Sequence, residues 1–432
     1  MRIGNIQHPT SNIQQPMGTR GLRSLIGCWM LDVGCWMFPL LLVACALLGA
    51  ALFAGCRPAP SGSVVNYETK NPIPNATVFH AGKATSTDAK GEFAVNHLEP
   101  GQPLLLRAAG FWPKRCEAPA QKQPRFELEP LETHGIYLSY AALGMPDTRA
   151  RALQLLDGEH LNTLIVDIKD RQGRMTFYNG APNAGQVGAF GAIKFNDMPG
   201  FLKQMHEKHI YVVGRLATFH DPLLAKHNPD WAVRAGSHPS NVWPDPYRKE
   251  VRDYMLAVIK EAAAAGFDEI ELDCVWFPGD REFPDASYAE HDSPANRLST
   301  ILSFLSQAAD ILAPSNIGLS LAPEVVLRWQ GPRQGKEMDR LTQAVQSFHA
   351  PLRNVQDLEK LKTVWGADMR QWRAYVEGGA PLGPDATAFR PEVTAVVKAC
   401  HTAGLGGWVL CDSRNQCAWS KDAVRALAPN EL

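Results

Sequence analysis

The strongest constraint on the fold is a regular alternation of apolar, strand-like segments with amphipathic, helix-like segments, starting near residue 135. Strands are expected at 135–139, 161–170, 210–219, 268–277, 317–324 and 407–412, and helices at 147–158, 196–209, 246–266, 293–313 and 391–403. This order is typical of parallel strands with crossover helices, in a doubly wound sheet or a (β/α)₈ barrel. Residues 140–144 follow the first strand without a GxGxxG phosphate turn, and a length of about 250–300 residues is typical of a barrel. The sequence therefore predicts an α/β fold with a TIM barrel over residues 134–428.

Residues 326–390 carry the weakest pattern in this region. The sixth and seventh strands should lie there, but only two short candidates, 346–348 and 373–376, have suitable apolar residues. We therefore expect a barrel that is distorted or incomplete around these two strands.

The first sixty residues have the pattern of an export signal. Residues 36–56 contain no charged side chain, and Arg20 and Arg23 precede them, which is the order of a secretory signal. Residues 52–56 resemble a bacterial lipobox, in which the cysteine is lipidated, so residues 1–56 are expected to be a signal peptide with a lipid anchor at Cys56. This predicts an exported protein, tethered to the membrane of the cell envelope. The alternative is an uncleaved anchor helix, because about 20 apolar residues can span a bilayer.

Residues 62–130 alternate short apolar runs with turn residues, which predicts a small β-sandwich. The segment also resembles the carboxypeptidase regulatory-like module. The matching pieces are Gly62-x-Val64, Pro72 to Val78, Thr87 to Phe93 and Gly110-Phe111. The resemblance implies a spacer or adhesion unit without a catalytic role.

Charged residues occupy alternate positions of the expected barrel strands. Because side chains alternate sides along a strand, Glu269, Glu271 and Asp273 should point into the barrel while Ile270 and Leu272 face the helices. The same argument directs four more charged side chains inward or to the rim: Asp167, Lys169, Arg215 and Glu324. A buried lone carboxylate is costly, so these groups need partners, a ligand or both.

Two interpretations of these charges remain open. In the first, Asp273 and Glu324 lie at the C-terminal rim, where barrel enzymes carry their active sites. Two carboxylates on neighbouring strands are what glycosidic bond cleavage needs, since one protonates the leaving oxygen while the other attacks or activates water. In the second, the charges form a structural network in which Lys169 and Arg215 neutralise Asp167 and Glu271, and this role is expected for Glu269 and Glu271.

Several other functions have no support in the sequence. The net charge of -1, the pI of about 6.9 and the lack of a Lys/Arg run argue against a nucleic-acid partner. Residues 206–209 lack the spacing of a zinc-binding helix, and no Ser-His-Asp order with a nucleophile elbow is present. We therefore predict neither a cofactor nor a metal. Cys411 and Cys417 are close enough in sequence for a disulfide in an oxidising compartment.

Residues 134–278 resemble the glycosyl hydrolase domain of a bacterial family of uncharacterised function, which is a TIM barrel similar to the α-amylase-type glycosidases. The matching pieces are residues 135–137, 161–163, 166–170 with 173–174, 206–215, 219–225, Trp243, 245–247, 266–270, Asp273 and 277–278. The resemblance implies that Asp273 is the family's carboxylate after the fourth strand. It also implies that Asp167, Lys169, Arg215 and Asp221 line the site.

The chain departs from the family at Trp276, which stands where an arginine is usual, and after the last strand, where residues 408–415 replace a Trp-Asn-Ala pattern. Trp243 and Trp276 fall in expected loops and are candidates for stacking on sugar faces, and Asp412 ends the last strand. The sequence thus predicts a glycoside hydrolase acting on a polysaccharide or oligosaccharide. The alternative is a catalytically inactive, carbohydrate-binding envelope lipoprotein.

Overall fold

The computed structural model describes residues 61–428 except 82, 96, 109, 159, 280–281, 316, 329–334, 366–368, 379–388 and 413–415. The predicted signal sequence and the lipidation site Cys56 therefore lie outside the described residues. No helix within the described part of the chain combines the length and hydrophobicity needed to cross a bilayer.

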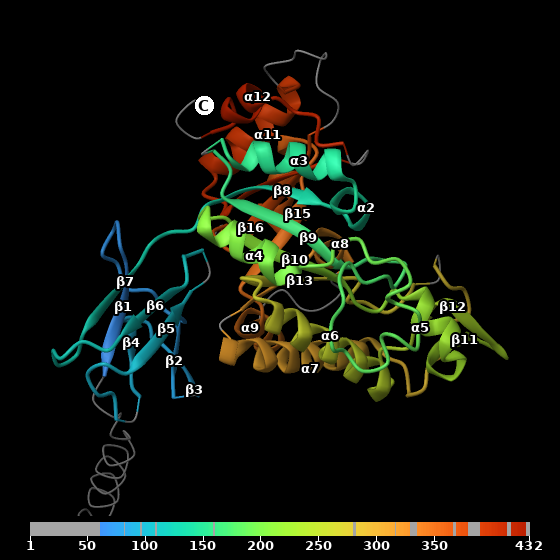
Figure 1. Cartoon of the computed structure of the whole chain (residues 1–432). Helices are drawn as coiled ribbons and strands as arrows, with labels where there is room; N and C mark the ends of the chain where they lie inside the picture. Colours follow the sequence, from blue (N-terminus) through green and yellow to red (C-terminus); the bar gives the residue numbers. More distant parts are fainter. Residues whose placement is uncertain are drawn as a thin grey trace, which may run out of the picture. The chain divides into compact units, whose positions relative to one another are not determined.

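Eight parallel strands close into a barrel, which confirms the predicted TIM barrel (Figure 1). In chain order they are β8 (Thr133–Leu138), β9 (Thr163–Lys169), β10 (Tyr211–Ala217), β13 (Glu269–Asp273), β14 (Gly318–Leu321), β15 (Ser347–Pro351), β16 (Trp372–Glu377) and β17 (Gly407–Cys411). Each strand pairs with the next, and β17 pairs with β8 from Gly407↔Thr133 to Leu410↔Ile136. Because the first and last strands are hydrogen-bonded, the doubly wound alternative is excluded.

The expected gap at the sixth and seventh strands is wrong, because β15 and β16 form at the two weak candidates and close the barrel. Their apolar pattern is weak because inward positions carry polar side chains. Ser347 and His349 of β15 point to Glu269 and Glu271, and Arg373 of β16 points to Glu269. These strands therefore have polar rather than apolar partners inside the barrel.

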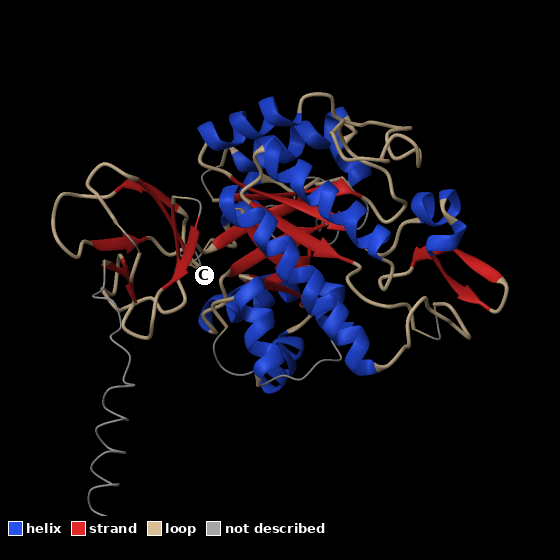
Figure 2. Ribbon diagram, turned by 90° about the horizontal axis from the view of Figure 1, so that it is seen from below, coloured by secondary structure: helices blue, strands red, loops and turns tan. Residues whose placement is uncertain are grey.

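Helices form a layer around the strands (Figure 2). They are α2 (Tyr140–Leu143), α3 (Pro146–Leu156), α4 (Met198–Glu207), α5 (Pro222–His227), α6 (Lys249–Ala265), α7 (Pro294–Leu312), α8 (Pro323–Arg328), α9 (Lys336–Ala344), α10 (Val355–Trp365), α11 (Pro391–Thr402) and α12 (Lys421–Arg425), with 3₁₀ turns η1 (Pro229–Trp231) and η2 (Ala313–Ser315). The main core lies between the two layers, where outward strand residues such as Val212, Ile270 and Leu272 are fully buried. The alternation deduced for β13 therefore holds.

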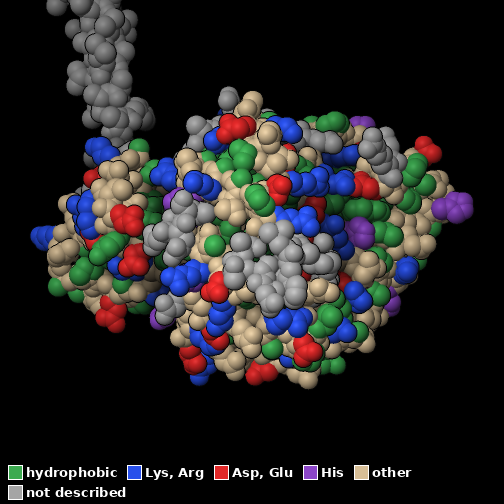
Figure 3. All heavy atoms as spheres, turned by 90° about the horizontal axis from the view of Figure 1, so that it is seen from above, with side chains coloured by type: hydrophobic (Ala, Val, Ile, Leu, Met, Phe, Trp, Pro, Cys, Tyr) green, Lys and Arg blue, Asp and Glu red, His purple; other side chains and the backbone are tan. Residues whose placement is uncertain are grey.

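An antiparallel hairpin, β11 (Ala232–Ala235) with β12 (His238–Pro244), is inserted between β10 and α6. On the face of the molecule shown in Figure 3, basic and acidic side chains are interspersed.

Two small sheets precede the barrel. The first has the order β4-β1-β7 and the second β3-β2-β5-β6. Their bounds are β1 (Gly62–Asn66), β2 (Thr77–His80), β3 (Lys83–Ser86), β4 (Glu92–Phe93), β5 (Pro103–Arg107), β6 (Lys114–Glu117) and β7 (Arg125–Leu128). Val64 of β1, Val78 of β2 and Leu106 of β5 are buried in one apolar cluster that both sheets share. The relation to the carboxypeptidase regulatory-like module stays a prediction.

Candidate active site

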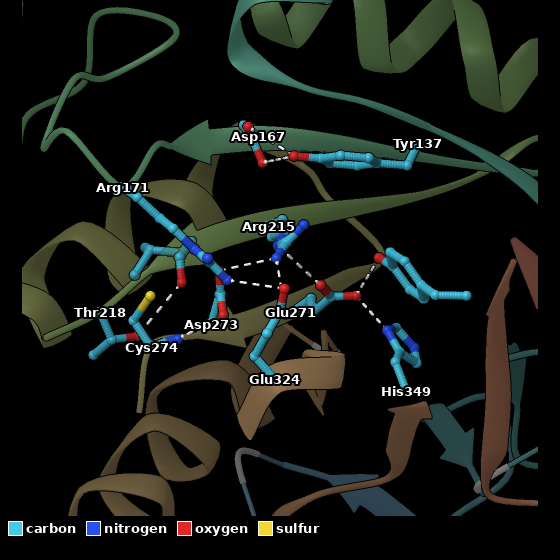
Figure 4. A network of polar contacts seen from close by, with 12 residues as sticks. Tyr137, Asp167, Arg171, Arg215, Thr218, Glu271, Asp273, Cys274, Glu324 and His349 are labelled. Carbon is cyan, nitrogen blue, oxygen red and sulfur yellow. Dashed lines mark hydrogen bonds and ion pairs between the residues drawn. The ribbon is translucent and has the colours of Figure 1, made fainter. Parts of the chain in front are cut away.

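A cavity of about 400 Å³ opens where the first strands of the barrel end. Four of the predicted site residues line it together with Glu324, and their arrangement is shown in part in Figure 4. The lining residues are Tyr137, Ser139, Tyr140, Ala141, Asp167, Lys169, Asp170, Arg171, Gln172, Arg174, Arg215, Ala217, Asp273 and Glu324. The structure therefore brings both predicted catalytic carboxylates to one cavity.

Asp273 ends β13 and is 1% exposed. Its Oδ2 accepts from Arg171 Nε at 2.8 Å and from Arg215 Nη2 at 2.9 Å, and its Oδ1 accepts from the Cys274 amide at 2.7 Å. Burial opposes ionisation of Asp273, but the charges of Arg215 and Arg171 and these hydrogen bonds outweigh it and lower its pKa to about 2. Asp273 is therefore an ionised carboxylate in the physiological pH range.

The backbone turns sharply directly after Asp273. Cys274 is fully buried and has a φ of 56°, a left-handed conformation that is uncommon for residues other than glycine. This conformation is fixed on both sides, because Thr218 N donates to Asp273 O at 2.8 Å and Phe219 N donates to Cys274 O at 3.1 Å. Backbone strain of this kind clusters at functional sites.

Glu324 follows β14 and lies in the first turn of α8, with 42% of its side chain exposed. It pairs with Arg171 Nη2 at 3.2 Å and with Arg215 Nη2 at 3.5 Å. Arg215 Nη2 also contacts Asp273 Oδ2, so these oxygens of Asp273 and Glu324 are at most 6.4 Å apart, the sum of the 2.9 and 3.5 Å contacts. Two carboxylates, one at the end of β13 and one just after the neighbouring β14, thus share two guanidinium groups.

Asp167 of β9 is held by neutral donors. It is 7% exposed, and the Tyr137 hydroxyl lies 3.0 and 3.1 Å from its two oxygens. The Tyr140 amide donates to Oδ2 at 2.8 Å. Burial raises the pKa of Asp167 to about 6, since the charge of Arg215 and the hydrogen bonds only partly oppose it.

Lys169 and Asp221 form a buried ion pair, with Nζ 2.9 Å from Oδ2 and both side chains fully buried. Lys169 also donates to Ala217 O at 2.7 Å and lines the cavity. Asp221 does not line the cavity, because its Oδ1 caps α5 through the Leu224 amide at 2.9 Å. The role in substrate binding predicted for Asp221 is therefore not supported by its position, and Lys169 neutralises Asp221 rather than Asp167.

Trp243, Trp276 and Asp412 do not line the cavity either. Trp243 is only 5% exposed and packs against His220 and Trp276, so its faces are not open to a sugar. The Arg328 guanidinium lies 4.6 Å from the Trp276 ring centroid and covers that ring.

Asp412 instead holds the backbone beyond β17, because its Oδ2 accepts from the amides of Gln416 and Cys417 at 2.9 and 2.8 Å. Cys411 and Cys417 are both free thiols, so the disulfide considered from the sequence is absent.

Deeper in the barrel, two buried carboxylates have a structural role, as the sequence indicated. Glu271 contacts Arg215 Nε at 3.3 Å, His349 Nδ1, and the Tyr375 hydroxyl at 2.6 Å. Its neighbour Glu269 binds a different set of partners: Arg373 at 2.7 Å, the Tyr211 hydroxyl at 2.9 Å and Ser347 at 3.3 Å. Both carboxylates thus have buried ionic and hydrogen-bonding partners inside the barrel.

Arg171, the most direct partner of the two rim carboxylates, was not predicted from the sequence. This residue lies in the loop after β9, and its side chain is 43% exposed. Its position in the Asp170-x-x-Gly173-Arg174 motif, which the family resemblance had marked, is the signal that could have identified it. Among the described residues, no group of three or more His, Cys, Asp or Glu side chains is arranged to hold a metal ion.

Residues 135–348 match a family model described as "Putative glycosyl hydrolase domain". No curated protein matches the sequence. Among solved structures, a hypothetical protein from Ruminiclostridium thermocellum is 29% identical, with 44% of this chain and 97% of that chain covered and a TM-score of 0.38.

Two further solved structures are more distant. A GH20 exo-β-N-acetylglucosaminidase from Vibrio harveyi is 11% identical, with 66% of this chain covered and a TM-score of 0.44, and the alignment spans 50% of that enzyme. Ega3 from Aspergillus fumigatus, solved with galactosamine, is 12% identical, with coverages of 67% and 94% and a TM-score of 0.39. The family match alone bears on the site: the matched residues 135–348 are similar to a glycosyl hydrolase domain and include Asp167, Asp273 and Glu324.

Proposed function

We propose that this protein is a glycoside hydrolase that acts on a polysaccharide or oligosaccharide, with Asp273 as its ionised catalytic carboxylate. The observation that carries the proposal is the convergence of Asp273 with other carboxyl groups on one cavity at the strand ends. Active sites of barrel enzymes lie at these ends, and glycosidic bond cleavage uses paired carboxylates. The match of residues 135–348 supports the reaction class.

In this mechanism Asp273 acts as the nucleophile. Its low pKa keeps it unprotonated, and its Oδ2 is oriented by two guanidinium groups. Retaining enzymes place their carboxyl groups roughly 5–5.5 Å apart, and inverting enzymes about 6.5–9.5 Å apart to admit a water. We propose the retaining course, because an ionised carboxylate held in place by two guanidinium groups can attack the anomeric carbon directly.

The proposal extends to where in the cell the protein acts. We infer an exported protein anchored in the cell envelope through a lipid on Cys56, because the lipobox-like residues 52–56 end an uncharged apolar run. The two sheets of residues 62–128 would then act as a carboxypeptidase regulatory-like spacer between the anchor and the barrel. A surface-tethered enzyme of this kind would meet extracellular or envelope glycans.

A second candidate is a non-catalytic carbohydrate-binding lipoprotein. One observation favours it: Asp273 and Glu324 are both already paired with Arg171 and Arg215, as in a purely structural network. In this case the cavity would bind a glycan without cleaving it.

The test is a screen of the full chain against a panel of glycans, followed by Asp273→Asn. We expect hydrolysis by the wild type and none by the variant, which should stay folded because asparagine preserves the shape of the side chain and Arg215 keeps Glu271 and Glu324 as partners. Asp253→Asn, at an exposed position of α6, is the matched control and should remain fully active. Hydrolysis by the Asp273 variant would contradict its role, and binding without cleavage by the wild type would support the second candidate.

A further inference from the structure

We propose that Asp167, rather than Glu324, is the catalytic acid that protonates the leaving group. This assignment rests on the proposed function, since it names the second carboxyl group of the same site. It replaces the prediction from the sequence, which paired Asp273 with Glu324 because they follow neighbouring strands.

The cations of the cavity are unevenly distributed among its carboxyl groups. Four carboxyl groups line it, and three have a guanidinium partner: Asp170 pairs with Arg174 at 2.5 Å, while Asp273 and Glu324 both pair with Arg171 and Arg215. Asp167 makes no ion pair with any described residue. A contacting guanidinium stabilises the anion and so favours loss of the proton that a catalytic acid must keep.

Neutral hydrogen-bond donors surround Asp167. The groups that face it are the Tyr137 hydroxyl from β8, the Tyr140 amide from α2 and, without contact, the charges of Arg215 and Asp170. Burial outweighs the groups that favour the anion, and the pKa of about 6 lies in the range suited to proton transfer near neutral pH. The Tyr140 amide donates to Oδ2, and the Tyr137 hydroxyl, which can donate or accept, lies 3.0 Å from Oδ1, so Oδ1 can carry the proton.

Asp167 and Asp273 also differ in their position relative to Arg215. Asp167 is in register with Arg215, whereas Asp273 is in register with Ala217, two residues nearer the mouth. Figure 4 shows Asp167 and Tyr137 on one side of Arg215, and Asp273 and Glu324 together on the other. An acid and a nucleophile must flank the scissile bond. Asp167 and Asp273 lie on opposite sides of Arg215, an arrangement that could place a sugar between them, while Glu324 lies on the same side as Asp273.

The chemical steps balance without a further reactant besides water. Asp167 transfers its proton to the glycosidic oxygen while the bond from that oxygen to the anomeric carbon breaks and Asp273 forms an ester with the carbon. The leaving sugar departs as an alcohol. Asp167, now a carboxylate, accepts a proton from water as the water oxygen attacks the anomeric carbon and the ester bond breaks. Both carboxyl groups thereby return to their starting protonation states.

The experiment compares Asp167→Asn with Glu324→Gln on two substrates, the glycan identified by the screen and a dinitrophenyl glycoside of the same sugar. The dinitrophenolate needs no proton to leave. We expect Asp167→Asn to lower kcat on the glycan by about 10²–10⁴-fold, the usual contribution of acid catalysis, with a much smaller loss on the dinitrophenyl glycoside. The alkaline limb of the pH profile of kcat should disappear in the same variant.

Glu324→Gln should change kcat on the two substrates by the same factor. A loss that depends on the leaving group in Glu324→Gln, and not in Asp167→Asn, would overturn the assignment.

An infrared titration of the full chain separates failure of the assignment from failure of the proposed function. The difference between wild type and Asp167→Asn should contain a protonated carboxyl band that titrates near pH 6. If that band is absent above pH 5, the assignment is refuted even for an active enzyme. If the band is present but neither substrate is cleaved, the proposed function has failed while the protonation of Asp167 stands.

Discussion

The ion pair between Glu269 and Arg373 provides the sharpest test of the energetics inside the barrel. Both side chains are almost fully buried, and Arg373 Nη1 lies 2.7 and 2.9 Å from the two carboxylate oxygens. Burial opposes ionisation of Glu269, but the charges of Arg373 and His349, with hydrogen bonds from Ser320 and Arg373, together outweigh it and lower the pKa from 4.5 to about 2. At 1.36 kcal/mol per pKa unit, this corresponds to roughly 3 kcal/mol of folding free energy.

The perturbation is Arg373→Met, which removes the charge and keeps most of the side-chain volume. Leaving a buried charge without its partner typically costs about 3–5 kcal/mol, so the free energy of unfolding at pH 7 should fall by about that amount. Arg353→Met is the matched control, because Arg353 is exposed and its loss should cost less than about 0.5 kcal/mol. Urea denaturation followed by circular dichroism measures both variants.

The stability that Arg373→Met loses should depend on pH, because it depends on the ionisation of Glu269. In the wild type the pKa of Glu269 is depressed, so its contribution is complete above pH 4.5 and disappears as the pH falls towards 2. In Arg373→Met burial is expected to raise that pKa above 4.5, so the variant gains relative stability when Glu269 becomes protonated. The difference between the two proteins should therefore shrink from pH 7 to pH 4.5.

A double variant tests whether the unpaired charge is the cause. Glu269→Gln combined with Arg373→Met leaves no buried charge and keeps an acceptor for the Tyr211 hydroxyl, so it should recover most of the stability. A loss below about 1 kcal/mol in Arg373→Met, or a loss that does not vary with pH, would refute this account of the barrel interior.

Two further predictions concern the site. Arg171→Ala removes one of the two cations that contact Asp273, so the pKa of Asp273 should rise. The acidic limb of the pH profile of kcat/KM should then move to higher pH. An unchanged limb would show that Arg215 alone lowers the pKa of Asp273. Gly173→Ala should destabilise the fold by more than about 1 kcal/mol, because Gly173 has a φ of +85° and a Cβ there would lie 2.2 Å from Asp221 Oδ1. Gly188→Ala is the control, because Gly188 has a φ of +80° and no atom lies within 4 Å of the added Cβ. Equal thermal midpoints for the two variants would exclude the clash with Asp221 as the cause.

The barrel and the direction of its charged side chains were predictable because both are local properties of the chain. Strand-helix alternation needs only the order of apolar residues, and the inward direction of Glu269, Glu271 and Asp273 follows from the alternation of side chains along one strand. The rim position of Asp273 follows from its place at the end of that strand. The pairing of Arg215 with Glu271 was predictable as well, since they occupy adjacent strands.

Partners that come from distant segments could not be predicted in this way. Closure at β15 and β16 depends on polar contacts of Ser347 and Arg373 with Glu269, about 80 and 100 residues away in sequence, which no local pattern reveals. The ion pair between Lys169 and Asp221 likewise depends on where the turn between β10 and α5 places Asp221.

The protonation of the cavity carboxyl groups is the clearest case of this limit. Asp167 and Asp273 are identical side chains at inward strand positions, but one has a pKa near 6 and the other near 2. The difference arises because two guanidinium groups from separate elements contact Asp273, whereas tyrosine and backbone donors surround Asp167. Coulomb energies depend on distances of a few ångströms in space, and only the folded chain sets those distances.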